Sequence, residues 1–442
     1  MEKQLRICMI AFQYAPNIGG AQTRAANQAH QLLESGHKAM IVTLRHDKQW
    51  KKYETLNAVP VVRIGGLFNA HGMLRVGRLG HLPIDILLFI HLWRTRHQYD
   101  VLHSIQISPL SGVATLIGQI TGKPVIISIP STGPGKIPRP EDAVMMADTL
   151  AGKLADSSFL KVPYADTVVG DVTHMRKTAY GGDLILTYLK KSAAFYQILS
   201  SRSLDYMISN GFRAAQIVHI PNGIEMAKFA PVQELRPDAT RPERDILCVA
   251  RLQYPKGIDV LLHAWKRMLS TPDQWRANLK PRLLLAGTGQ AEEQLKRLAQ
   301  ELALGENVVF LGSHDDVIPL LQAAWGFVLP SRWEGMPNAL LEAMSCKVPC
   351  IATRVSGSED IIKNGINGLL VETEQPAELA QALQQLISNP TLAHRLAQAG
   401  YETVMSHYQL THITEQFIQF YRQILTHEAH VTPKVLETVG EK

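Results

Sequence analysis

Two carboxylates, Glu334 and Glu342, flank the start of an expected helix and could bind a phosphorylated sugar. The apolar residues 325–329 predict a strand, and a short loop leads from it to Pro337. Proline suits the first turn of a helix, because its φ is fixed and its missing N–H would have no partner there. Free N–H groups at a helix start can bind phosphate. We therefore expect Glu334 to accept hydroxyl protons from a sugar and Glu342 to meet a ribose.

The same two carboxylates could instead form the acid/base pair of a hydrolase. A helical path from Glu334 to Glu342 would span about 12 Å, whereas glycosidase carboxylates lie roughly 5–10 Å apart. Two ligand-binding roles therefore fit better than a paired acid and base. For Glu342 alone, a favourable interaction with the helix dipole is the alternative.

The spacing of these carboxylates after a strand and Pro330-Ser331 resembles that of the family 4 glycosyltransferases, retaining enzymes of the GT-B type with two Rossmann-like domains. Further segments resemble other motifs of the family. They are Pro16-Asn17-Ile18-Gly19-Gly20-Ala21-Gln22, Pro221-Asn222-Gly223-Ile224, Val249-Ala250-Arg251-Leu252 with Lys256-Gly257, Leu285-Ala286-Gly287-Thr288-Gly289, and Val309-Phe310-Leu311-Gly312. The resemblance covers residues 5–425 and is strongest over 220–375.

The resemblance implies that Arg251 and Lys256 bind the diphosphate of a nucleotide sugar, although a surface salt bridge is the alternative for this pair. Negative charge grows on the diphosphate as the glycosyl bond breaks, so cations, N–H dipoles or a metal must stabilise it. The chain has no convincing Asp-x-Asp motif, and Asp315-Asp316 is interpreted as a solvated turn. We therefore expect a metal-independent, cofactor-free site. Its donor-binding helix start would comprise Gly335, Met336, Pro337 and Asn338.

Three glycines in other loops are also expected near the donor. By the resemblance, the backbone of Gly19 and Gly20 approaches the sugar phosphate or the acceptor from the opposite domain. Gly287 belongs to a Gly-x-Gly turn, and Glu292 stands where a dinucleotide fingerprint would need glycine. By itself, a double glycine is often only a turn.

One loop departs from the family's pattern. Many members carry a histidine after the strand that matches residues 125–129, where this chain reads Pro130-Ser131-Thr132-Gly133. A Ser-Thr-Gly variant occurs in part of the family, so we expect Ser131 and Thr132 to supply hydroxyl contacts instead. His103 resembles the family's Asp-Val-x-His motif; it could lie near the sugar, but a structural role is favoured.

The order of apolar segments predicts two α/β domains with parallel sheets. Expected strands lie at 5–12, 40–44, 59–64, 101–105, 125–129, 246–250, 282–286, 308–311, 327–329, 350–353 and 368–371. Expected helices lie at 23–35, 110–120, 258–269 and 292–302. We divide the chain into an acceptor-binding domain, a nucleotide-sugar-binding domain and a tail, at 1–222, 223–425 and 426–442, with an insertion at 134–180. Ligands would bind beyond the carboxyl ends of the strands, in the cleft between the domains.

The two halves of the chain differ in charge. Residues 1–222 hold 24 Lys and Arg against 14 Asp and Glu, while residues 223–442 hold 21 against 25. A basic first half favours an anionic partner. Within it, residues 71–97 mix arginines with large apolar side chains and could lie on an anionic membrane. An ordinary helix with solvated arginines fits equally well, whereas nucleic acid fits less well because the basic residues lack aromatic stacking partners.

The compartment is expected to be the cytoplasm. Four scattered cysteines give no disulfide framework. No signal peptide is visible, and the apolar run at 84–93 is far shorter than the roughly 20 residues that span a bilayer. Peripheral contact with the inner face of the cell membrane is compatible with this.

These observations predict a retaining hexosyltransferase that uses a UDP- or GDP-sugar and a glycan or lipid-linked acceptor, in bacterial surface polysaccharide synthesis. A catalytically silent, sugar-nucleotide-binding regulator on the same fold is one alternative, supported by the missing histidine. An NAD-dependent enzyme is the other, and it lacks a complete glycine fingerprint. The donor base, the sugar, the acceptor and the oligomeric state are left open.

Overall fold

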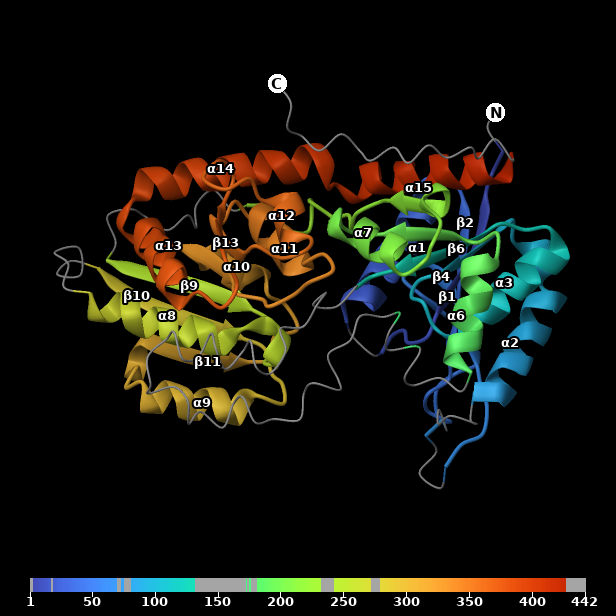
Figure 1. Ribbon diagram of the computed structural model, residues 1–442, viewed down its shortest axis with the longest axis horizontal. Coiled ribbons are helices and arrows are strands. Elements are labelled where there is room, and N and C mark those ends of the chain that lie inside the picture. The colour runs from blue at the N-terminus through green and yellow to red at the C-terminus, as the bar shows by residue number, and fades with distance from the viewer. Residues whose placement is uncertain are drawn as a thin grey trace.

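The computed structural model describes residues 3–16, 19–69, 73–74, 81–131, 172, 175, 181–231, 242–271 and 279–426. These residues form two α/β domains that lie side by side, each built on its own sheet (Figure 1). The expected fold class is confirmed. Most of the expected insertion at 134–180, and the tail beyond residue 426, lie outside the described residues.

The first domain is built on an eight-stranded sheet with the order β3-β4-β2-β1-β5-β6-β7-β8. Its strands are β1 (Arg6–Ala11), β2 (Lys38–Leu44), β3 (Tyr53–Leu56), β4 (Val59–Ile64), β5 (Val101–Ser104), β6 (Val125–Ile129), β7 (Phe195–Ile198) and β8 (Ile217–His219). Its helices include α1 (Gly20–Glu34), α2 (His81–Arg94), α3 (Pro109–Thr121), α6 (Gly182–Lys191) and α7 (Arg202–Ser209). All neighbouring strands are parallel except β3 and β4. Strands β5 and β6 are buried along their whole length, as is usual in a parallel sheet covered on both faces.

The second domain is built on a parallel six-stranded sheet with the order β11-β10-β9-β12-β13-β14. Its strands are β9 (Glu243–Val249), β10 (Lys280–Ala286), β11 (Val308–Gly312), β12 (Gly326–Leu329), β13 (Cys350–Thr353) and β14 (Leu369–Val371). Its helices are α8 (Ile258–Ser270), α9 (Glu292–Glu301), α10 (Ile318–Ala323), α11 (Asn338–Ser345), α12 (Ser358–Ile361), α13 (Pro376–Ser388) and α14 (Pro390–His407).

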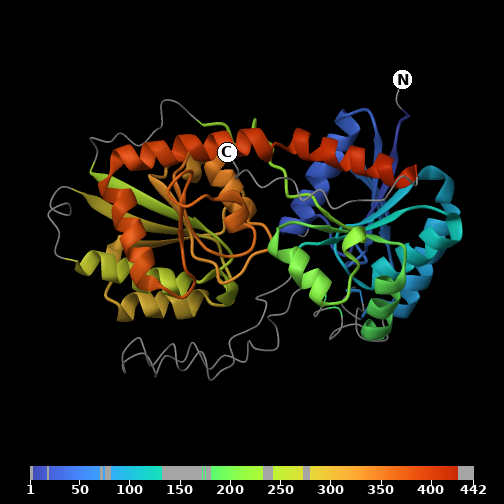
Figure 2. The same cartoon turned by 45° about the horizontal axis from the view of Figure 1, so that its top comes forward.

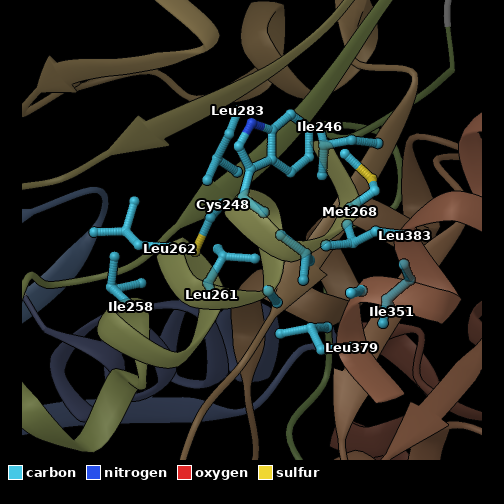
Figure 3. Close-up of a cluster of buried hydrophobic side chains, with 14 of the residues drawn as sticks. Ile246, Cys248, Ile258, Leu261, Leu262, Met268, Leu283, Ile351, Leu379 and Leu383 are labelled. Atoms are coloured by element: carbon cyan, nitrogen blue, oxygen red, sulfur yellow. The ribbon is translucent and has the colours of Figure 1, made fainter. Parts of the chain in front are cut away.

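A continuous apolar core fixes the position of the second sheet. Leu261 of α8 and Leu383 of α13 meet Ile246, Cys248 and Leu283 of the sheet, and all five are buried (Figure 3). Each such side chain contributes roughly 1.5–3 kcal/mol by leaving water. The strand ends that carry the candidate site therefore rest on a rigid base.

The chain crosses between the domains twice. The two crossings pair through the backbone, because Ile224 N donates to Tyr408 O at 2.8 Å and Leu410 N donates to Ile224 O at 2.9 Å. After the second crossing, α15 (Leu410–Leu425) lies along the first domain, whereas α14 lies along the second (Figures 1 and 2). Phe417 and Tyr421 of α15 share a core with β1 and α1. The last helix thus packs on the first domain, although the sequence-based division places it with the second.

Candidate active site

The loop between β12 and α11 forms the centre of the candidate site. As predicted, the helix begins directly after Pro337, at Asn338. The N–H groups of Leu340 and Leu341 both donate to the Pro337 carbonyl. The N–H groups of Asn338 and Ala339 therefore precede the helical ladder and can bind an anion.

Glu334 and Lys256 are brought together at this helix start. Lys256 Nζ lies 2.5 Å from Glu334 Oε1, and Ser331 Oγ donates to the same oxygen at 2.7 Å. The Lys256 and Glu334 side chains are 20% and 10% exposed, so the pair is accessible only at its edge. Lys256 closes a short 3-10 turn after β9, and Gly257 follows it with a φ of +61°. The arrangement presents a cation and a carboxylate side by side.

Close glycine contacts hold the loops that surround this pair. A Cβ at Gly257 would lie 2.1 Å from Pro330 O, and a Cβ at Gly287 would lie 2.0 Å from Ala250 O. The loops after β9, β10 and β12 therefore approach more closely than any side chain would permit. Arg251 follows Ala250 directly; its side chain is exposed and forms no ion pair with the described residues. It is thus available to a ligand phosphate.

The first domain contributes the opposite wall. A Cβ at Gly335 would lie 1.7 Å from Pro130 O and 3.4 Å from Ser131 Cα. Gly19 is the N-cap of α1, and a Cβ at Gly20 would lie 3.8 Å from Asn338 Nδ2. The structure therefore brings Gly19, Gly20 and Ser131 to the helix start of the second domain.

Glu342 lies on α11 and has a perturbed carboxyl group. Burial raises its pKa, and the positive charge of Lys228 partly offsets that effect. Within the described part of the chain, the carboxylate has no hydrogen-bond partner. It can therefore accept hydrogen bonds from a ligand.

One predicted residue, His103, does not join this group, and another, Thr132, is not described. His103 is fully buried, with its ring nitrogens 2.7 Å from Tyr421 Oη and 2.9 Å from Ser128 Oγ. Burial and the nearby Arg24 lower its pKa to about 3, so it is a neutral core residue. The favoured structural role agrees with this position, and a role near the sugar does not. Thr132 lies outside the described residues.

Asn222 is a site residue that the sequence reasoning did not single out. It is 5% exposed, its Nδ2 donates to Asn338 Oδ1 at 2.8 Å, and its backbone N–H donates to Met336 Sδ at 3.1 Å. The sequence signal was its place in the Pro-Asn-Gly motif between the domains. Its contacts show that the first interdomain crossing touches the helix start.

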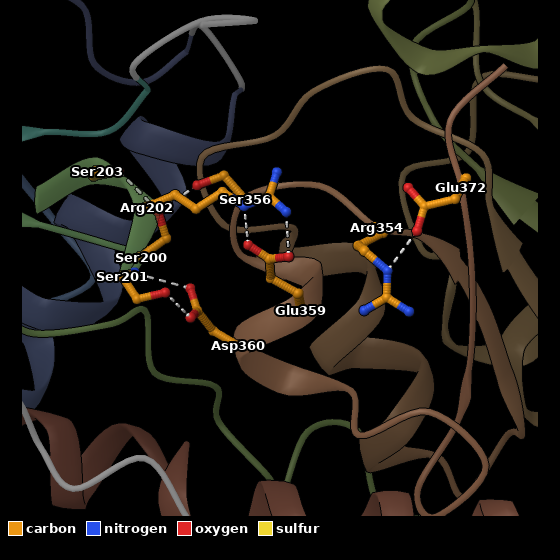
Figure 4. A network of polar contacts seen from close by, with 9 residues as sticks. All are labelled: Ser200, Ser201, Arg202, Ser203, Arg354, Ser356, Glu359, Asp360 and Glu372. Carbon is orange, nitrogen blue, oxygen red and sulfur yellow. Dashed lines mark hydrogen bonds and ion pairs between the residues drawn. The ribbon is translucent and has the colours of Figure 1, made fainter. Parts of the chain in front are cut away.

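A polar network joins the domains beside the site (Figure 4). Ser200 Oγ lies 2.5 Å from Ser356 Oγ, and Ser201 N donates to Asp360 Oδ2 at 3.0 Å. Arg202 Nη2 donates to Glu359 Oε2 at 2.6 Å. The network connects the start of α7 in the first domain to α12 in the second.

No group of three metal-ligating side chains occurs among the residues that the structure describes. Asp315 and Asp316 are exposed in the loop before α10, where Asp316 Oδ1 accepts a hydrogen bond from Ile318 N at 2.9 Å.

Comparison with known proteins decides the family. The sequence profile described as Glycosyl transferases group 1 matches residues 233–403, and the profile described as Glycosyl transferase 4-like domain matches residues 19–223. The chain belongs to the group 1 glycosyltransferases. The predicted family is confirmed. Membership in this family excludes the alternative of an NAD-dependent enzyme.

Individual relatives of this group 1 glycosyltransferase are distant. An uncharacterised glycosyltransferase of Methanocaldococcus jannaschii is 25% identical over 439 residues, covering 95% of this chain and 98% of that protein. The UDP-Gal:alpha-D-GlcNAc-diphosphoundecaprenol alpha-1,3-galactosyltransferase of Escherichia coli is 31% identical over 182 residues, covering 39% of this chain and 46% of that enzyme. Among solved structures, Anabaena HepE in complex with UDP has a TM-score of 0.69 and 18% identity, covering 95% of this chain and 100% of that one. This last likeness concerns the fold.

Proposed function

We propose that this group 1 glycosyltransferase is a retaining hexosyltransferase that takes a sugar from a UDP- or GDP-sugar. The observation that carries the proposal is the Lys256–Glu334 pair at the start of α11, facing the glycine loop of the first domain. A nucleotide diphosphate needs cations and N–H donors, and a sugar needs a carboxylate acceptor. Lys256 and Glu334 offer a cation and a carboxylate within hydrogen-bonding distance of each other.

The diphosphate would lie between Lys256, Arg251 and the free N–H groups of Asn338 and Ala339. These groups would stabilise the charge that grows on the leaving phosphate, in place of a metal. Glu334 would orient the sugar hydroxyls, and Glu342 would accept from the ribose. Gly20 and Ser131 leave room for the sugar and the acceptor on the opposite wall.

A front-face displacement, in which the leaving phosphate helps to deprotonate the acceptor, fits this site. Glu334 already accepts hydrogen bonds from Lys256 and Ser331, and His103 lies in the core, so neither is placed to act as a free general base. Proton NMR of the product's anomeric signal tests this step. Retention gives the same anomer as the donor, and inversion would refute the mechanism.

The proposed acceptor is a glycan or a lipid-linked glycan at the inner face of a membrane, in surface polysaccharide synthesis. The outer face of α2 supports this, because Leu82, Ile86 and Ile90 are 63%, 52% and 40% exposed. Arg94 and Arg96 follow, and Arg96 lies 4.7 Å from the centre of the Trp93 ring. A helix that is apolar on both faces suits a lipid surface better than water. Helix α2 also lies at the edge of the first domain away from the second (Figure 1).

No helix among the described residues is long and apolar enough to cross a bilayer. The proposed membrane contact is peripheral, and co-sedimentation with vesicles tests it. Vesicles containing phosphatidylglycerol should retain the protein, whereas phosphatidylcholine vesicles or the variant Ile86→Ser/Ile90→Ser should not. Equal binding of the variant would refute the role of α2.

A thermal-shift screen with UDP-, GDP- and ADP-sugars, with Mg²⁺ or with EDTA, tests the donor proposal. Ligands that bind the folded state raise its melting temperature. We expect one nucleotide class to stabilise the protein equally with and without Mg²⁺, and Arg251→Ala to lose the effect. Stabilisation without any transfer to acceptors would favour the silent regulator, and no stabilisation by any donor would refute the proposal.

A further inference from the structure

Arg332 occupies an unusual place in the loop that carries Glu334. It stands two residues before Glu334, yet its side chain points away from solvent and is only 8% exposed. Burial lowers the pKa of its guanidinium, but the charges of Asp259 and Glu374 outweigh burial and hold the pKa above its ordinary value. A buried, permanently charged arginine is costly unless its donors are satisfied.

The guanidinium joins the loops after β9, β12 and β14. It grips Asp259 with two hydrogen bonds, from Nη1 to Oδ1 at 2.9 Å and from Nη2 to Oδ2 at 2.7 Å. Nη1 also donates to Tyr254 O at 2.7 Å, and Nε donates to Glu374. The guanidinium lies 4.0 Å from the centre of the Tyr254 ring, so its flat face is covered as well.

The backbone of Arg332 adds a further connection between the same loops. Arg332 N donates to Pro255 O at 2.8 Å, directly beside Lys256. Glu374, in the third loop, has a φ of +59°, a conformation that a glutamate rarely adopts without a tertiary restraint. Lys256 thus lies between two anchor points, Tyr254 in its own turn and Asp259 in the first turn of α8.

We propose that Arg332 is a positioning residue that sets the separation of Lys256 and Glu334. The inference rests on the proposed function, because it assigns the purpose of this geometry to donor binding. Lysine cannot replace arginine here, since a single ammonium cannot grip a carboxylate with two parallel bonds and also reach a second carboxylate. The separation is critical because a misplacement of about 1 Å at an active site can cost about 100-fold in rate.

The experiment compares Arg332→Lys with a matched control, Arg282→Lys. Arg282 also grips an aspartate with two bonds, to Asp245 at 2.8 and 2.6 Å, but it lies near the opposite ends of β9 and β10 and its side chain is half exposed. Glu374→Gln is a milder second variant, because Glu374 is 41% exposed and the Asp259 bonds survive. UDP, GDP, UDP-glucose and GDP-mannose are titrated by calorimetry against all four proteins.

We expect Arg332→Lys to bind the nucleotide that the wild type prefers about tenfold more weakly or worse, and Arg282→Lys to bind it normally. In hydrogen exchange of the ligand-free proteins, Arg332→Lys should speed exchange in the segments 254–259 and 331–335 together, and Glu374→Gln should do so to a smaller extent. If Arg332→Lys exchanged at the wild-type rate in both segments, the positioning role would be overturned. It would also be overturned if the wild type bound a nucleotide and Arg332→Lys bound it with the same affinity. A wild type that binds neither UDP nor GDP would refute the proposed function, and the exchange measurement would still decide whether Arg332 holds the loops.

Discussion

At the scale of single residues, the candidate site needs particular side chains to keep their charge or their size. Glu342 is the clearest case of charge, because its carboxylate is largely buried and its pKa is raised by that burial. In the ionised form both of its oxygens would accept hydrogen bonds from ribose hydroxyls, whereas the protonated form keeps only part of that acceptor capacity. As the pH falls towards the raised pKa of Glu342, a growing fraction of this carboxylate becomes protonated.

We therefore expect nucleotide affinity to fall between pH 7.5 and pH 5 in the wild type and to change less in Glu342→Gln. Calorimetry with the preferred nucleotide at several pH values measures both. The nucleotide's own phosphate titrates equally in the two titrations, so the difference isolates Glu342. Parallel pH profiles would contradict the ribose role.

Gly335 is the clearest case of size. Gly335→Ala places a Cβ against the Pro130 carbonyl, and relieving that clash by moving backbone costs roughly 1–3 kcal/mol. We expect a lower melting temperature and weaker nucleotide binding. Gly65→Ala is the control, because its added Cβ would make only an ordinary contact with Phe68 at 3.8 Å. If Gly335→Ala resembled this control, the close approach of the domains would be disproved.

At the scale of elements, the sequence predicted the longer strands with uninterrupted apolar runs and missed the short strands β3, β7 and β8. The predicted bounds at 59–64, 125–129 and 350–353 are those of β4, β6 and β13. The missed β3 is a polar edge strand, and β7 contains Gln197, a buried polar residue that bonds Arg24 and Ile220 O. Short strands that contain polar residues, such as these, depend on tertiary partners that periodicity does not reveal.

The site shows the same division. The motif predicted Glu334, Lys256 and the helix start as site residues, because their local spacing resembles the family's pattern. Asn222 and Arg332 were missed, since their importance lies in contacts with Asn338 and Asp259 far along the chain. His103 matched a motif, but the packing of α15 against it determines its buried, structural position.

The burial of the Asp85 carboxyl group on helix α2 should lower the stability of the folded protein. Asp85 Oδ1 is buried without a partner among the described residues, and burial raises the pKa of Asp85 to about 6. As the pH rises from about 4 to about 6, the folded state keeps a proton that the unfolded state has released, so the free energy of unfolding falls. The full destabilisation is present above pH 6. We expect Asp85→Asn to raise the melting temperature by ~1–3 °C at pH 7.5. The gain should vanish as the pH falls towards 4, and a gain independent of pH would contradict the assignment.

At the scale of the whole molecule, polar contacts beside the site link the two domains. Asp360 of the second domain accepts from Ser201 N, at the start of α7 in the first domain, and Arg202 pairs with Glu359. The Arg202–Glu359 ion pair is partly exposed, and such pairs are individually weak, at about 1 kcal/mol or less. Contacts of this strength can break and re-form if the domains move relative to each other.

We expect Arg202→Ala/Asp360→Ala to increase the radius of gyration of the free protein in small-angle X-ray scattering, and the preferred nucleotide to reverse part of the increase. Glu372→Ala is the control, because it removes an ion pair with Arg354 inside the second domain. Identical scattering from the double variant and the control would show that this network does not restrain the domains.

The central claim is that Lys256 and the start of α11 bind the diphosphate of a sugar nucleotide. The most direct test is calorimetric titration of UDP and GDP into the wild type, Lys256→Met and the control Lys296→Met, which removes an exposed lysine of α9. A charge-assisted bond to phosphate contributes about 1.5–3 kcal/mol, so Lys256→Met should bind the preferred nucleotide roughly 10- to 100-fold more weakly. The control should bind as the wild type does. Equal affinity of Lys256→Met and the wild type, or a wild type that binds neither nucleotide, would contradict the claim.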